Sequence, residues 1–237
     1  MTRTSHTAAT VIAASALAAW IVSVTRMRGM DMGPGTDLGG LGWFLGIWVT
    51  MMAAMMLPSA MPMVLLFGHV AARQTASRGV LGPTAVFVAG YLGVWTAFGI
   101  VAFGLARLVR DLEPGFVAGH GRLVAGAAIV TAGLYQVTAL KRLCLRHCRS
   151  PLAFLVGHWR DGGLGAIAMG AAHGAYCVGC CTGLMLILFA LGVMSLPWMA
   201  VVAALVFAEK VLPAGDRLSP LIAVGLVALG LWVAVQP

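Results

Sequence analysis

The chain has 237 residues, of which 61% are hydrophobic and only 9% are charged, a composition that excludes an ordinary soluble globular domain. Its formal net charge of +8 would suit a nucleic-acid-binding protein, but the positive residues lie in short segments between long apolar runs. There they set the orientation of membrane helices, so we exclude nucleic acid as a partner. The five cysteines are odd in number and not spaced as in a disulfide-stapled secreted domain. We expect residues 1–237 to form a single all-α, polytopic transmembrane helix bundle in the lipid bilayer.

Long apolar runs predict about seven membrane spans. They lie near residues 8–25, 41–71, 83–106, 117–139, 163–193, 197–212 and 220–235. The bundle has six spans if residues 198–212 do not cross. The first run resembles a signal peptide, because Ala16-Leu17-Ala18 imitates a cleavage site. It continues to Val24, which favours a retained first helix, and cleavage would leave the orientation of the rest unchanged.

The distribution of positive charge predicts how the bundle lies in a bacterial inner membrane. If all seven runs span, ten of the 15 Lys and Arg residues fall on one side. These ten are Arg3, Arg73, Arg78, Lys141, Arg142, Arg146, Arg149, Arg160, Lys210 and Arg217. The other five are Arg26, Arg28, Arg107, Arg110 and Arg122. Since the more positive side faces the cytoplasm, we expect the amino terminus and the segment around Cys144 to be cytoplasmic.

Methionines gather in two places along the chain. Met27, Met30 and Met32 lie in the Gly- and Pro-containing segment after the first run, which we expect to be a loop facing outward. Thioethers bind Cu(I), so these three are secondary metal candidates. The alternative is a loop that dips into the lipid headgroups.

The second group of methionines lies in the run 41–71. Met51 and Met55, like Met52 and Met56, are four residues apart, so that each pair lies along one side of a helix. All four are candidate metal ligands, although we expect only one pair to face a site. The alternative is a methionine stripe that fills gaps in the core.

The run 163–193 contains no charged residue, yet it holds His173, Cys177, Cys180 and Cys181 near its middle. At about 100° per residue these four lie at roughly 0°, 40°, 340° and 80°, on one face of a helix. A polar cluster inside a membrane span indicates a functional site, and sulfur with imidazole suits Cu(I) or zinc. The alternative is close helix packing, since small residues line the same helix. They are Gly170, Gly174, Gly179 and Gly183.

The basic segment before this helix carries Cys144 and Cys148, four residues apart, with His147 between them. These are further secondary metal candidates. At 1.5 Å per residue we expect them about 15–25 Å from Cys177, too far to share its metal.

Glu209 and Lys210 follow one another in apolar surroundings. As a proton or ion pair, Glu209 would take the proton that a thiol releases on binding metal. The alternative is a helix end whose charges reach the membrane interface. To Tyr91, Trp95 and Tyr135 we assign no role beyond packing or the membrane interface.

The centres of the runs 41–71 and 163–193 lie at similar depth, so the methionine and His/Cys groups together predict one soft-metal site near the membrane midplane. The sequence also resembles a family of bacterial integral membrane proteins described only as predicted metal-binding, over roughly residues 41–215. The resemblance rests on Trp48, Met51, Met52, Met55, Met56, Leu57, Pro58, Lys141, Cys144, Cys148, Gly170, His173, Gly174, Tyr176, Cys177, Gly179, Cys180, Cys181, Trp198, Met199, Glu209 and Lys210. It implies metal binding in a membrane.

We therefore expect a protein that handles Cu(I), by transport or by delivery to a partner cuproprotein or metallochaperone, rather than an enzyme. Zinc is the alternative metal. One competing function is a membrane thiol–disulfide redox protein using Cys177, Cys180 and Cys181, although the sequence nearby offers nothing obvious to stabilise a thiolate. Another is a metal-free assembly factor. Metal stoichiometry on protein purified anaerobically separates the three.

Overall fold

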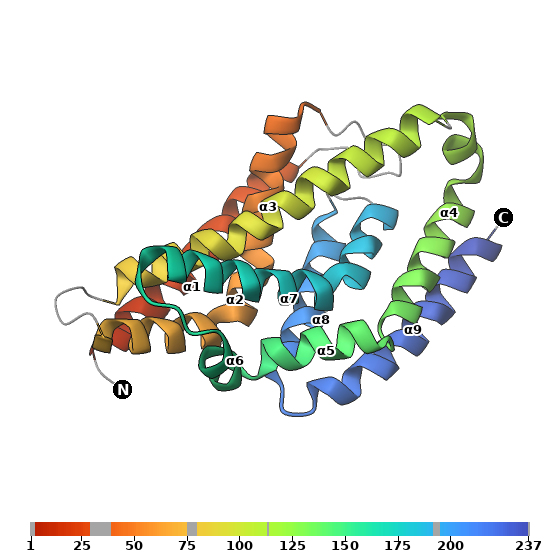
Figure 1. The fold of residues 1–237 in the computed structure, drawn as a ribbon. Coiled ribbons are helices and arrows are strands. Elements are labelled where there is room, and N and C mark those ends of the chain that lie inside the picture. The colour runs from red at the N-terminus through yellow and green to blue at the C-terminus, as the bar shows by residue number, and fades with distance from the viewer. Residues whose placement is uncertain (1–2, 29–38, 75–79, 113, 192–194, 237) are drawn as a thin grey trace.

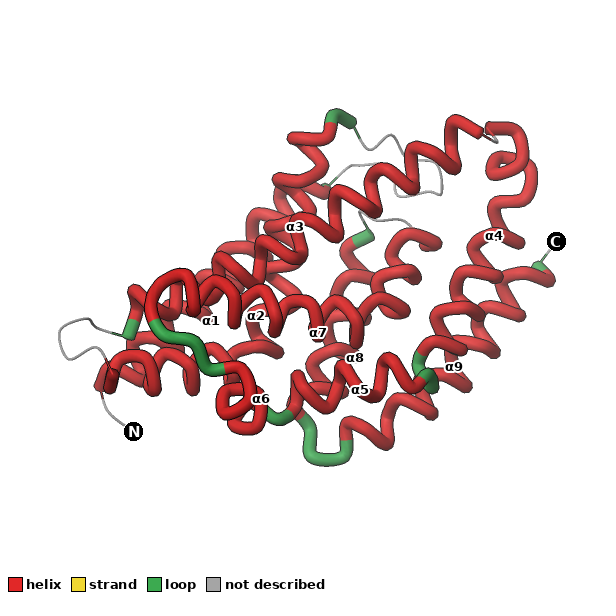
Figure 2. The backbone as a smooth tube through the Cα atoms, in the orientation of Figure 1, coloured by secondary structure: helices red, strands yellow, loops and turns green. Residues whose placement is uncertain are grey.

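The computed structural model describes residues 3–28, 39–74, 80–112, 114–191 and 195–236, and this part of the chain is helical almost throughout (Figure 1). Its helices are α1 (Arg3–Met27), α2 (Leu41–Gln74), α3 (Leu81–Leu112), α4 (Pro114–Tyr135), α5 (Ala139–Arg149), α6 (Pro151–His158), α7 (Gly162–Leu191), α8 (Leu196–Val211) and α9 (Gly215–Val235). Figure 2 shows no strand in the described ranges, and the described connections on either side of α5 and α6 are short. The all-α prediction is confirmed.

In the part of the chain that the structure describes, five helices are long and apolar enough to cross a membrane. They are Thr7–Met27, Leu41–Gln74, Leu81–Leu108, Gly162–Leu191 and Arg217–Val235. A sixth crossing is available if His120–Tyr135 and Ala139–Arg149, which meet at 63°, form one broken span. The predicted span 197–212 does form a helix, α8, but its 16 residues are about 24 Å long, short of a hydrocarbon core of about 30 Å. The described residues thus offer five or six crossings, which fits the alternative count of six, in which residues 198–212 do not cross, and not the count of seven.

The basic segment between the fourth and fifth predicted spans folds into α5 and α6. Thr138 caps α5 by accepting a hydrogen bond from the backbone N–H of Lys141 at 3.3 Å, and Pro151 opens α6. Arg142 and Arg146 are exposed on α5, whereas Leu145 is buried. Helix α5 is thus amphipathic, with its apolar side packed mainly on α7.

Helix α7 lies at the centre of the bundle and packs against α3, α4, α5 and α8. Its glycines lie at three of these contacts. Gly170 and Gly174 face the backbone of α3 at Phe87 and Tyr91, Gly179 faces Cys144 of α5, and Gly183 faces Tyr135 of α4. The small residues of α7 do permit close approach of its neighbours, and they do so around the cysteines.

Candidate metal centre

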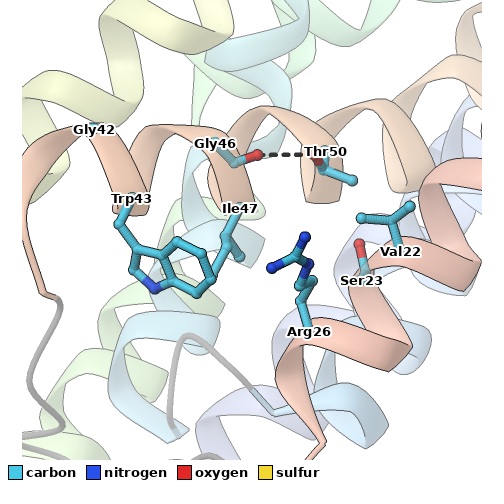
Figure 3. Close-up of a pocket in the computed structure, with 8 residues that line it drawn as sticks. All are labelled: Val22, Ser23, Arg26, Gly42, Trp43, Gly46, Ile47 and Thr50. Carbon is cyan, nitrogen blue, oxygen red and sulfur yellow. Dashed lines mark hydrogen bonds between the residues drawn. The ribbon is translucent and has the colours of Figure 1, made fainter.

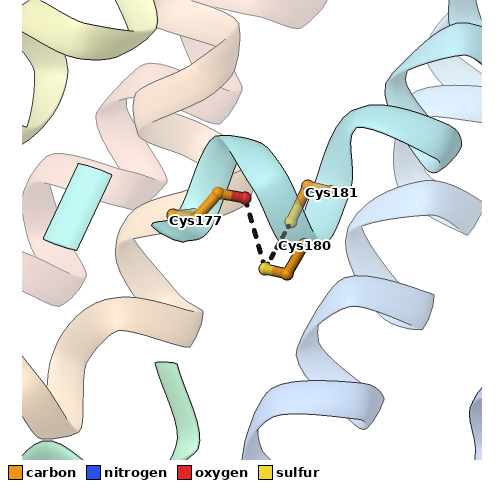
Figure 4. Close-up of side chains that lie close together, drawn as sticks. All are labelled: Cys177, Cys180 and Cys181. Carbon is orange, nitrogen blue, oxygen red and sulfur yellow. Dashed lines mark hydrogen bonds between the residues drawn. The ribbon is translucent and has the colours of Figure 1, made fainter. Parts of the chain in front are cut away.

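Cys177, Cys180 and Cys181 lie on one turn of α7, and Figure 4 shows their side chains gathered there. Their three sulfur atoms all lie within 4.8 Å of one another, and the Sγ atoms of Cys180 and Cys181 are 3.5 Å apart. All three residues are at most 2% exposed. With metal–sulfur bonds of about 2.3 Å, trigonal ligands lie about 4.0 Å apart, so the three thiols fit a soft metal ion with little movement. We call these three residues the cysteine turn.

Cys177 has two polar neighbours that the sequence did not indicate. Lys210 of α8 donates a hydrogen bond from Nζ to the Cys177 sulfur at 2.9 Å, and the Tyr91 hydroxyl of α3 lies 2.9 Å from the same atom. Both side chains are buried. The expectation that nothing near the motif would stabilise a thiolate is therefore wrong, since an ammonium group is the kind of neighbour that activates thiols.

His173 lies one turn before Cys177 and is 2% exposed. Its ring packs among Phe87, Tyr91 and Phe154, with centroids 5.4–6.2 Å apart. Within the part of the chain that the structure describes, His173 Nδ1 is buried with no hydrogen-bond partner. A buried ring nitrogen without a hydrogen bond lowers the stability of the fold, unless the nitrogen binds a metal ion or a proton. His173 is not among the three groups that converge within 4.8 Å, so its role as a ligand stays a prediction.

The predicted separation of Cys144 and Cys148 from the cysteine turn is wrong. The Cys148 Sγ lies 3.8 Å from that of Cys180, and Cys144 packs against Gly179. The prediction assumed that residues 144–177 continue in one direction along the axis of α7. The chain instead bends by 63° after α4, so that α5 runs alongside α7. His147, next to Cys148, stacks on Tyr176 of α7 with ring centroids 4.1 Å apart.

Glu209 and Lys210 do not pair with each other. Glu209 is 2% exposed and binds Lys141 Nζ with both carboxylate oxygens at 2.7 Å, and the Ser219 hydroxyl donates to it at 2.8 Å. Lys141 also donates to Gln136. Consecutive side chains on a helix point about 100° apart, so Glu209 faces α5 while Lys210 faces the cysteine turn. Burial also rules out the alternative in which both charges reach the interface.

The predicted methionine ligands are all in the core where the structure describes them. Met51, Met52, Met55 and Met56 are at most 2% exposed on α2, and no pair is turned to solvent. Their part in a metal site stays a prediction. Met27 is the last residue of α1 and is 1% exposed, so it belongs to a helix and not to a loop. Met30 and Met32 lie outside the described residues.

A separate hollow of about 240 Å³ lies between the end of α1 and the start of α2 (Figure 3). Its lining consists of Val22, Ser23, Arg26, Gly42, Trp43, Gly46, Ile47 and Thr50. None of these offers sulfur or imidazole, so the hollow adds nothing to the metal centre.

A family model described as "PpoB2: Copper chaperone" matches residues 45–233, most of the chain, and the chain therefore belongs to this family. The match covers α3 to α8 in full and includes every residue of the cysteine turn. No curated protein matches the chain significantly, and no solved structure does.

Proposed function

We propose that this member of the copper chaperone family is a membrane-embedded protein that binds Cu(I) on the cysteine turn and delivers it to a partner cuproprotein. The observation that carries the proposal is the convergence of three buried thiols, those of Cys177, Cys180 and Cys181, within 4.8 Å. Soft sulfur ligands favour Cu(I), whereas structural zinc is bound by four ligands. The apolar helices support a membrane location.

The charges around the turn also support a thiolate site. Three thiolates and one Cu(I) carry a net charge of −2, which a buried site cannot hold unpaired. The Lys210 ammonium, 2.9 Å from Cys177, offsets one of these charges. A hydrogen bond from the Tyr91 hydroxyl would spread the remainder.

His173 and one methionine pair of α2 complete the proposal as further ligands. The methionines lie in the same hydrophobic core as the cysteines. His173 is buried one turn before Cys177, and its Nδ1 has no hydrogen-bond partner among the described residues. We place the protein in a bacterial inner membrane with a cytoplasmic amino terminus. This orientation depends on the predicted spans before residue 198, around which eight Lys and Arg residues lie in the predicted cytoplasmic segments and five in the predicted outer segments.

Replacing one thiol tests the proposal. The copper content of protein purified anaerobically should fall about tenfold in Cys177→Ser, because a serine hydroxyl is nearly isosteric but a poor ligand for Cu(I). Met185→Leu is the matched control, since Met185 is 1% exposed on the same helix and this swap conserves volume. Folded Cys177→Ser protein that holds as much copper as the parent would refute the site. Equal loss from Met185→Leu would indicate a packing defect.

A thiol–disulfide redox protein is the second candidate, favoured by the 3.8 Å separation of the Cys148 and Cys180 sulfurs and by Lys210 beside Cys177. The same purified protein separates the two functions. A redox protein shows reversible two-electron oxidation without copper, whereas a chaperone binds stoichiometric Cu(I) under reducing conditions. A metal-free assembly factor shows neither.

A further inference from the structure

A chaperone must release its metal, and the cysteine turn alone offers no route, because its three residues are at most 2% exposed. We propose that Cys148 of α5 is a transfer ligand, which moves Cu(I) between Cys180 and the outer side of α5. This inference rests on the proposed function, since it gives the bound copper a path.

Burial decreases in steps from the turn outward. Cys180 is 2% exposed, and its sulfur lies 3.8 Å from that of Cys148, which is only partly buried. The outer face of α5 carries the exposed side chains of Arg142 and Arg146 beside those of Leu140 and Leu143, which are 56% and 53% exposed. A face that mixes guanidinium groups with exposed leucines is typical of a helix at the membrane–water interface, where the charged groups reach water. Cys148 is thus the partly buried thiol of the helix that separates the cysteine turn from this interfacial face.

The sulfur spacing suits an exchange with little motion. The Sγ atom of Cys180 has two sulfur neighbours, that of Cys181 at 3.5 Å and that of Cys148 at 3.8 Å. Cys180 can therefore stay bound to the ion before and after the exchange. Both distances are close to the separation of about 4.0 Å expected for two sulfurs of a trigonal site. Cys177, held by Lys210 and Tyr91, stays in place while the ion shifts.

The exchange balances without an oxidant or reductant. A copper–sulfur bond to Cys148 forms as the bond to Cys181 breaks, and copper stays in the +1 state. The proton that the Cys148 thiol loses is taken up by the Cys181 thiolate, so the number of bound protons is unchanged. Ligands of the partner then replace Cys148, Cys180 and Cys177 in turn. Each copper–sulfur bond to this chain breaks as a bond to a partner ligand forms, and each freed thiolate takes up the proton that the incoming ligand loses.

Cys144 provides the matched control because it is on the same helix, one turn before Cys148. It is 7% exposed, and its sulfur lies against the backbone of α7 at Gly179. The described contacts place it at a helix–helix contact and not beside the sulfur of Cys180. Loss of its thiol should therefore leave copper transfer unchanged.

The experiment measures binding and release separately on the full chain in detergent, without oxygen. Parent, Cys148→Ser and Cys144→Ser protein are loaded with one equivalent of Cu(I), and release to excess bathocuproine disulfonate is followed by absorbance. We expect all three to hold the same amount of copper. Release from Cys148→Ser should be about tenfold slower, a barrier increase of about 1.4 kcal/mol, and release from Cys144→Ser should match the parent.

Release from Cys148→Ser at the parent rate would overturn the inference and leave the proposed function intact. Copper lost from Cys148→Ser at equilibrium would also overturn it, because Cys148 would then be a permanent ligand. A parent protein that takes up no Cu(I) would refute the proposed function itself. Cys148→Ala is a further control. Slow release from this variant as well would exclude an effect of the serine hydroxyl, and a melting temperature equal to that of the parent would exclude misfolding.

Discussion

Lys210 connects the cysteine turn to α8 and supplies positive charge where a Cu(I)–thiolate centre would accumulate negative charge. Lys210→Met keeps the length of the side chain and removes that charge. We expect the affinity for Cu(I) to fall about 10- to 100-fold, the effect of losing one hydrogen bond to a charged group. Competition with a chromophoric Cu(I) chelator measures it. Tighter binding by Lys210→Met would show instead that the ammonium competes with the metal for Cys177.

Lys141 and Glu209 form a second buried pair, separate from the thiols, which joins α5 to α8. Glu209→Gln leaves the Lys141 ammonium buried without its counter-charge, so we expect a loss of about 3–5 kcal/mol in the free energy of unfolding. The double variant Lys141→Met with Glu209→Gln should recover part of this loss. Thermal melting of both single variants and the double variant gives the coupling between the two residues. Additive losses would show that the pair does not act as a unit.

At the scale of helices, close packing of α3 on α7 brings Tyr91 to the cysteine turn. A methyl group added at Gly170 would collide with the backbone carbonyl of Phe87, which cannot move without moving α3. We expect Gly170→Ala to lower the free energy of unfolding by about 1–3 kcal/mol, as for other overpacked interiors, and to weaken copper binding. Gly93→Ala is the control, because a methyl group there meets open space on α3. A Gly170→Ala protein as stable as the Gly93→Ala protein would contradict the tight contact.

The sequence was sufficient for the long apolar helices and for the cysteine turn because both depend on local spacing, whereas α5 and α6 were not predicted. Apolar runs gave the helices, and the period of 3.6 residues placed Cys177, Cys180 and Cys181 on one face. The path of the chain between helices is not local. The sharp bend after α4 brings Cys148 to Cys180, and no pattern in the segment 139–149 specifies which helix it packs against.

Partners that belong to separate helices were missed for the same reason. In the sequence, nothing distinguishes Tyr91 from the other aromatic residues of the apolar runs. Its contact with Cys177 depends on the packing of α3 on α7. The buried Lys141 and Lys210 did carry a signal, since a charge inside an apolar stretch needs a partner. The sequence did not identify the partner of either lysine. It suggested Glu209 as the partner of Lys210, whereas in the structure Glu209 pairs with Lys141 and Lys210 contacts Cys177.

For the molecule as a whole, the cover of the cysteine turn decides how the proposed membrane location and metal delivery fit together. The turn is central in α7, and one side of it is covered by α5, whose outer face carries Arg142 and Arg146 beside the exposed Leu140 and Leu143. Lipid tails alone on that side would leave two guanidinium groups without water or counter-charge. In the proposed membrane location, an α5 at the membrane–water interface would keep the thiols buried and separated from water by this one helix.

The orientation predicted from charge stays a prediction, and engineered cysteines test it. Ser150 is exposed between α5 and α6, on the predicted cytoplasmic side, and Gly40 is exposed before α2, on the predicted outer side. A membrane-impermeant maleimide added to intact bacterial spheroplasts should label Gly40→Cys but not Ser150→Cys. Opened membranes should allow labelling of both, and the parent protein gives the background from its own thiols. Labelling of Ser150→Cys in intact spheroplasts would reverse the orientation, and copper leaving along α5 would then be delivered outside the cytoplasm.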